Sequence, residues 1–151
     1  MRPLAVELAF DHASDQRLGR VWSRLLELYA GPKDSDLGVR SHITLALFRS
    51  GEPRNVGDLI QSLAKVVAPF DLNLAVADRS PTSEGVVFLR PEPSRELTRA
   101  HAILHELLGP DRGLVHAYYR PPAWTPYCTM AINVAEPFID AVLSAWFASG
   151  G

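Results

Sequence analysis

Two short segments of the chain combine a ring side chain with a threonine two residues later. One is His42-Ile43-Thr44 and the other is Tyr127-Cys128-Thr129. Residues two apart in a β-strand point to the same face, so each pair would present a ring and a hydroxyl side by side. An imidazole, with an ordinary pKa of about 6.5, can act as acid or base near neutral pH. If the two halves of the chain pack as equivalents, both polar faces would line one cleft.

The surrounding sequence predicts the elements that carry these pairs. Apolar residues alternate with period two around both pairs, and each pair is followed, after a short loop, by an amphipathic helix. Asp11 or Ser14, Asn55 and Ser94 are candidate N-caps of helices, and Pro137 suits a first helical turn. The resulting prediction is an α+β domain with strands near 4–10, 42–48, 70–77, 85–90 and 127–134, and helices near 14–30, 55–69, 94–109 and 137–147.

Composition narrows the class of protein. The chain has 151 residues, 47% hydrophobic and 21% charged, which is a single-domain length with enough apolar material for a core. Fifteen basic against 17 acidic residues give a net charge of −2, which argues against bulk binding of nucleic acid. One cysteine, Cys128, excludes an internal disulfide. The sequence shows no membrane span or signal peptide, so we expect a cytoplasmic protein with no membrane contact.

The two motifs and their contexts resemble the two-histidine (2H) phosphoesterases, which include the 2′-5′ RNA ligase-like proteins and the cyclic phosphodiesterases. The first motif of that superfamily is matched by Arg40-Ser41-His42-Ile43-Thr44-Leu45, and the second by Trp124-Thr125-Pro126-Tyr127-Cys128-Thr129. The lead-in Tyr118-Tyr119-Arg120-Pro121 and the order of elements are also similar. The resemblance covers nearly the whole chain. It implies a duplicated, bilobal α+β fold, with residues 1–151 as one domain of two pseudo-equivalent lobes and antiparallel or mixed sheets flanked by helices.

The resemblance also implies a reaction at a nucleotide or RNA-end phosphodiester, either hydrolysis of a 2′,3′-cyclic phosphate or ligation, with no metal or other cofactor. His42 and the residue at position 127 would be the acid and base. Thr44 and Thr129 would hold the phosphate oxygens. Arg40, two residues before His42, is a candidate phosphate contact from the sequence itself, because arginine can bind phosphate. From the residues themselves, Tyr119, Arg120 and Trp124 are candidate substrate contacts, because aromatic rings can stack on bases and arginine can bind phosphate.

Tyr127 stands where the superfamily has its second histidine. A phenol can donate a hydrogen bond but is a poor base at neutral pH, so we expect a reduced or one-sided activity. A non-catalytic nucleotide- or phosphate-binding module remains an alternative, as does an interaction domain with no phosphate site. The superfamily also usually continues into a further strand, and its lack here would leave a sheet edge open for a possible homodimer.

The remaining histidines and the cysteine have simpler interpretations. His101 and His105 are spaced to bind zinc from one helix face, but helix packing is favoured because Ala102 stands where a metalloprotease has Glu. His116 is not expected to replace the missing histidine, and His12 is expected in an exposed position. Cys128 falls on the predicted inward face, which favours a buried, inert thiol.

Overall fold

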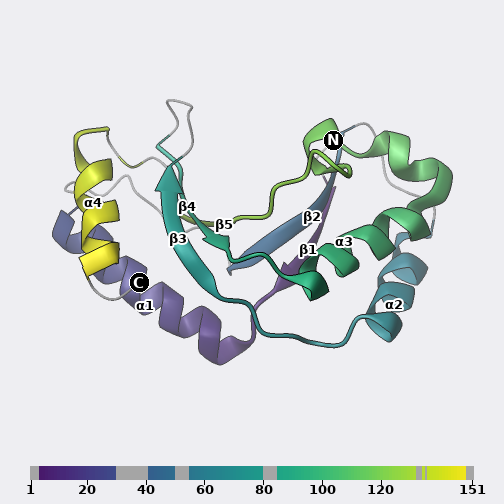
Figure 1. The fold of residues 1–151 in the computed structure, drawn as a ribbon, viewed down its shortest axis with the longest axis horizontal. Coiled ribbons are helices and arrows are strands. Elements are labelled where there is room, and N and C mark those ends of the chain that lie inside the picture. The colour runs from purple at the N-terminus through teal and green to yellow at the C-terminus, as the bar shows by residue number, and fades with distance from the viewer. Residues whose placement is uncertain are drawn as a thin grey trace. The chain divides into compact units, whose positions relative to one another are not determined.

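The computed structural model describes residues 4–29, 41–49, 55–79, 85–131, 134 and 136–148. In these residues helices and antiparallel strands follow one another along the chain, which confirms the predicted α+β class (Figure 1). The chain forms two compact units. Unit 1 comprises Met1–Leu8, Thr44–Leu72 and Pro93–Pro126, and unit 2 comprises Ala9–Ile43, Asn73–Glu92 and Tyr127–Gly151. The pseudo-equivalence of two lobes stays a prediction.

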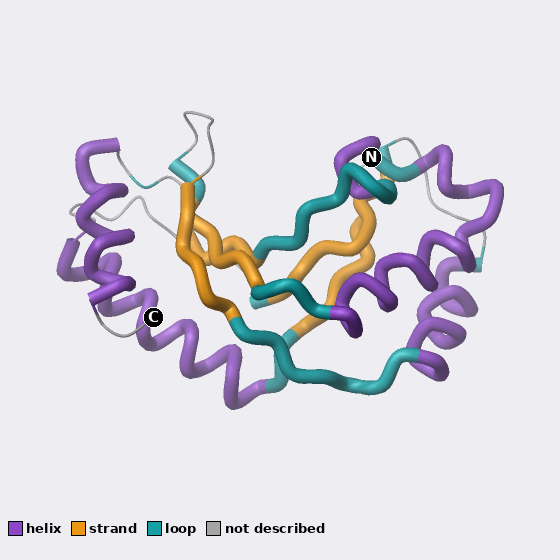
Figure 2. Tube along the Cα trace, viewed as in Figure 1, coloured by secondary structure: helices purple, strands orange, loops and turns teal. Residues whose placement is uncertain are grey.

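Unit 2 is built on a sheet of three strands in the order β3 (Leu74–Arg79), β4 (Val87–Pro91) and β5 (Cys128–Ala131). Two helices, α1 (His12–Tyr29) and α4 (Glu136–Ala148), pack against one another and cover one face of this sheet (Figure 2). Trp22 of α1 stacks on Trp146 of α4, with ring centroids 5.2 Å apart. The side chains on the covered face that are almost fully buried are apolar: Ala77, Val87, Leu89, Cys128 and Met130.

Unit 1 contains most of the two-stranded sheet of β1 (Leu4–Ala9) and β2 (His42–Phe48). Its helix α2 (Val56–Val66) packs on α3 (Arg95–Leu108). Two short 3₁₀ helices that the sequence did not predict follow α3: η1 (Gly109–Leu114) and η2 (Ala117–Tyr119). The chain between them runs along the end of β2. There the Arg49 N–H donates to the Leu114 carbonyl and the His116 N–H donates to the Leu47 carbonyl, at 2.8 and 2.7 Å.

The predicted helix caps have mixed outcomes. Ser94 caps α3 by accepting a hydrogen bond from the Leu97 N–H at 3.1 Å, and Asp11 accepts one from the Ser14 N–H at 3.1 Å. Asn55 precedes α2 as predicted, but its side chain makes no cap hydrogen bond because its backbone is left-handed, with φ of 56°. Asn55 therefore occupies the predicted N-cap position of α2 without a side-chain hydrogen bond.

Strand bounds differ from the prediction at the edges of the unit 2 sheet. β3 begins at Leu74 rather than at residue 70, where its ladder with β4 starts opposite Pro91. Pro91 has no N–H to donate, and the next residue, Glu92, donates its N–H to the Asn73 carbonyl at 2.8 Å. β5 begins at Cys128, one residue after Tyr127, and the end predicted for this strand partly lies outside the described residues.

Candidate active site

His42 is the first residue of β2, and the backbone before it is held on two sides. The Ser41 N–H donates to the Asp15 carboxylate of α1 at 2.7 Å, and the Ser41 carbonyl accepts from the Phe10 N–H at 3.3 Å. Ser41 is buried, while the His42 side chain is half-buried. Helix α1 and the chain after β1 therefore fix the backbone position from which the His42 side chain extends.

The start of β5 lies against the start of β2 within unit 2. The backbone of His42 lies beside the Cys128 thiol and by itself would lower the pKa of this thiol. Burial nevertheless dominates and raises the pKa of this thiol to about 11. Because Cys128 lies between Tyr127 and Thr129 in the chain, this contact brings the second predicted motif next to the first predicted catalytic residue.

Tyr127 and Thr129 belong to the open face of the unit 2 sheet, opposite the helices. Thr129 is the cross-strand partner of Phe88, and the Phe88 ring packs against the Tyr127 ring with centroids 5.2 Å apart. Tyr127 is 38% exposed and Thr129 is half-buried, whereas Cys128 between them is fully buried. The alternation predicted for this segment is confirmed from Cys128 to Met130.

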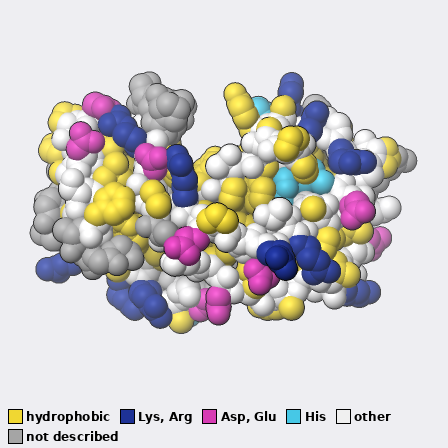
Figure 3. All heavy atoms as spheres, in the orientation of Figure 1, with side chains coloured by type: hydrophobic (Ala, Val, Ile, Leu, Met, Phe, Trp, Pro, Cys, Tyr) yellow, Lys and Arg dark blue, Asp and Glu magenta, His cyan; other side chains and the backbone are white. Residues whose placement is uncertain are grey.

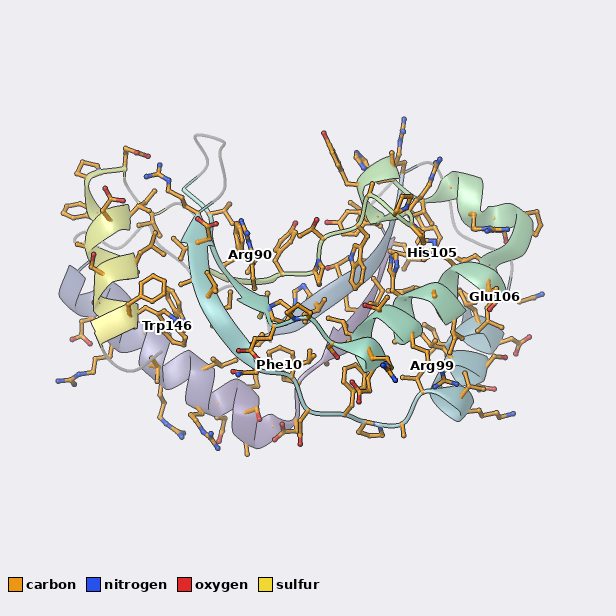
Figure 4. All side chains as sticks on the ribbon, viewed as in Figure 1. Phe10, Arg90, Arg99, His105, Glu106 and Trp146 are labelled. Atoms are coloured by element: carbon orange, nitrogen blue, oxygen red, sulfur yellow. The ribbon has the colours of Figure 1, made fainter. Side chains whose placement is uncertain are left out.

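The open face carries an arginine as well. Arg90 of β4 lies with its guanidinium carbon 5.6 Å from the centre of the Phe88 ring, and it donates to the Asp78 carboxylate of β3 at 2.6 Å. Figure 4 shows Arg90 and Trp146 on opposite sides of this sheet. The face thus combines two aromatic rings, a hydroxyl and an oriented cation.

Thr44 lies two residues after His42 on β2 and is half-buried like it. The Trp124 indole N–H donates to the Thr44 carbonyl at 3.1 Å within unit 1. Beyond Thr44 the expected open face is closed, because the side chains of Ala46 and Phe48 are buried. Both are apolar, so covering them leaves no polar group without a partner.

His101 and His105 form a buried pair on α3. The His101 ring stacks on Trp124, 3.8 Å between centroids and 7° from parallel, and its Nε2–H donates to the Tyr119 carbonyl at 2.7 Å. His105 lies 4.3 Å from His101 between ring centroids and its Nε2 is 3.4 Å from the Leu45 carbonyl. Burial lowers the pKa of His101 to about 4 and also lowers that of His105. Both rings are therefore neutral packing groups of unit 1 at pH 7.

A known protein family matches almost the whole chain. The model of the 2′-5′ RNA ligase superfamily matches residues 12–149, a range that contains both motifs. The chain belongs to the 2′-5′ RNA ligase superfamily. No curated protein matches it.

The other predicted substrate contacts of this superfamily member lie in unit 1. Arg120 donates from Nε to the Val115 carbonyl at 2.9 Å and from Nη2 to the Gly113 carbonyl at 3.1 Å. Tyr119 is half-buried, and its carbonyl accepts the hydrogen bond from His101. Trp124 contacts both His101 and the Thr44 carbonyl. All three residues therefore make structural contacts, and their contact with substrate stays a prediction. Arg40 lies outside the described residues.

The sequence motifs do not include three residues near the candidate site: Asp15, Phe88 and Arg90. The alternation from Val87 to Arg90 could have indicated two of them, since it places Phe88 and Arg90 on the same face of the strand. Asp15 gave no such signal, because its contact with Ser41 spans 26 residues.

The described residues contain neither a metal-binding cluster nor a membrane-spanning helix. Among them no three His, Cys, Asp or Glu side chains are grouped so that they could hold a metal ion. No described helix is long and apolar enough to cross a membrane.

Proposed function

We propose that this 2′-5′ RNA ligase superfamily member hydrolyses 2′,3′-cyclic phosphates of nucleotides or RNA ends by metal-independent acid–base chemistry, with a reduced rate. The observation that carries the proposal is the contact between the two motifs inside a chain that belongs to this superfamily. The backbone of His42 reaches the thiol of Cys128, which separates Tyr127 from Thr129.

In the proposed reaction, His42 accepts a proton from the attacking water as the oxygen of that water bonds to phosphorus. The bond from phosphorus to one ribose oxygen breaks, and the Tyr127 hydroxyl or solvent supplies the proton that this oxygen needs. The product is a phosphomonoester, and solvent restores both side chains. Hydroxyls of Thr44 and Thr129 would donate to the non-bridging oxygens.

The replacement at position 127 accounts for the reduced rate. A positioned acid or base typically contributes on the order of 10²–10⁴ in rate. A phenol donates a hydrogen bond but gives up its proton less readily than an imidazolium does. His42 is therefore the principal catalytic residue of the proposal.

The charge distribution supports a substrate bound through one phosphate group. On the described part of the face seen in Figure 3, Lys and Arg side chains are interspersed with Asp and Glu side chains. Bulk binding of nucleic acid relies on many phosphates neutralised together, which such a distribution does not favour.

The test is hydrolysis of adenosine 2′,3′-cyclic monophosphate by the wild-type chain and by His42→Ala. We expect slow turnover by the wild type and at least about a hundred-fold loss in His42→Ala. His12→Ala, which removes an exposed imidazole at the start of α1, is the matched control and should keep the wild-type rate. Equal rates in the wild type and His42→Ala would contradict the proposal.

A further inference from the structure

The open face of the unit 2 sheet has more aromatic and cationic groups than acid–base catalysis requires. Tyr127, Phe88 and Arg90 lie together on this face, and both the phenol ring and the guanidinium group are close to the Phe88 ring. The distances from the centre of the Phe88 ring are 5.2 Å to the Tyr127 centroid and 5.6 Å to the guanidinium carbon of Arg90. We call these three residues the Phe88 pillar.

We propose that the Phe88 pillar is the nucleoside subsite of this protein, where the base of a nucleotide stacks and Arg90 binds its phosphate. This inference rests on the proposed function and adds to it the residues that would bind the base and the phosphate of the nucleotide. Aromatic rings and guanidinium planes are the surfaces on which proteins stack unpaired bases.

Arg90 is oriented for this role by Asp78. One nitrogen, Nη2, donates to the Asp78 carboxylate at 2.6 Å, and a guanidinium has five N–H donors in all. The Arg90 side chain is 48% exposed, so water, and hence a ligand, can reach it. An arginine fixed by a carboxylate loses less side-chain freedom when it binds phosphate than an unrestrained one does.

The register of the sheet places the Phe88 pillar next to the proposed chemistry. Phe88 is the cross-strand partner of Thr129, and such partners have Cβ atoms roughly 4.5–5.5 Å apart. A base stacked on the pillar would therefore be close enough for the phosphate of the same nucleotide to reach the Thr129 hydroxyl. Stacking tolerates any base, since every base has a π-face, so we expect little preference among the four.

The test is titration calorimetry with adenosine 3′-monophosphate and with inorganic phosphate, using the full chain. We expect Phe88→Leu to weaken nucleotide binding by about ten-fold or more and to leave phosphate binding within about two-fold. Arg90→Gln should weaken both ligands. Phe88→Tyr keeps the ring and should keep the nucleotide affinity.

Matched controls come from the helical side of the same unit. Phe147→Leu changes an exposed aromatic ring of α4, and Arg20→Gln changes an exposed arginine of α1; neither should alter binding. The subsite is overturned if the wild type does not bind the nucleotide, if Phe88→Leu binds it as tightly as the wild type, or if Phe88→Leu loses nucleotide and phosphate affinity equally.

The outcomes separate this inference from the proposed function. If the wild type binds adenosine 3′-monophosphate with the expected dependence on Phe88 but hydrolyses no cyclic nucleotide, the subsite stands and the proposed reaction fails. If the wild type hydrolyses the cyclic nucleotide and Phe88→Leu has an unchanged KM, the reaction stands and the subsite is overturned.

Discussion

The backbone of His42 lies beside the thiol of Cys128, so the first residue of β5 is next to the first residue of β2 inside unit 2. This contact joins two sequence motifs that are far apart in the chain. Cys128 has a structural role, because its side chain is fully buried.

The buried thiol predicts slow reaction with thiol reagents. Only the thiolate is reactive, and burial raises the pKa of Cys128 to about 11, so at pH 8 the native chain should react with Ellman's reagent at least about a hundred-fold more slowly than the unfolded chain. The chain has no other cysteine, so the absorbance change reports this site alone. Equal rates in buffer and in concentrated urea would contradict the burial of Cys128.

The buried histidine pair predicts a loss of stability in mild acid. Burial keeps His101 and His105 neutral in the folded chain, whereas in the unfolded chain each is protonated below its ordinary pKa of about 6.5. As the pH falls from 6.5 toward 4, the unfolded state binds more protons. The free energy of unfolding should then fall by on the order of 1 kcal/mol per pH unit because of His101, and His105 should add to this fall.

Urea unfolding at pH 7, 6 and 5 measures this slope. His101→Gln should flatten it, while His12→Gln, which changes an exposed imidazole, should leave it as in the wild type. A wild-type slope that is unchanged by His101→Gln would show that the pair does not control acid stability.

Replacing glycine by alanine should have opposite effects on stability at two positions, Gly85 and Gly19. Gly85 has φ of 67°, and an added Cβ would lie 2.2 Å from the Val134 carbonyl oxygen, so Gly85→Ala should destabilise unit 2 by more than 1 kcal/mol. Gly19 lies within α1 with open space around it, and Gly19→Ala should stabilise the helix by about 0.5–1 kcal/mol. Thermal unfolding of both variants checks the sign, and a stable Gly85→Ala would contradict the turn geometry before β4.

Local patterns in the sequence predict the elements well because their causes are local. The period-two run from His42 to Phe48 coincides with β2, and Ser94 and Gly109 bound α3 as a cap and a left-handed stop. The same alternation predicts that Cys128 is buried between Tyr127 and Thr129. These features depend on side chains a few residues apart.

Tertiary contacts of the candidate site could not be predicted in the same way. Three such contacts join residues that no local periodicity relates: the bond from Ser41 to Asp15, the bond from Trp124 to the Thr44 carbonyl and the pairing of Arg90 with Asp78. The two 3₁₀ helices after α3 were missed for a related reason, because single turns have too few residues to show a period.

The residue at position 127 offers the most direct test of the proposed acid–base pair. Hydrolysis of adenosine 2′,3′-cyclic monophosphate should be measured for the wild type, Tyr127→His, Tyr127→Phe and the double variant Tyr127→His with His42→Ala. We predict that Tyr127→His raises kcat by on the order of 10²–10⁴, that Tyr127→Phe lowers it further, and that the double variant loses the gain. A Tyr127→His variant no faster than the wild type, with its fold intact by circular dichroism, would contradict the pairing of His42 with position 127.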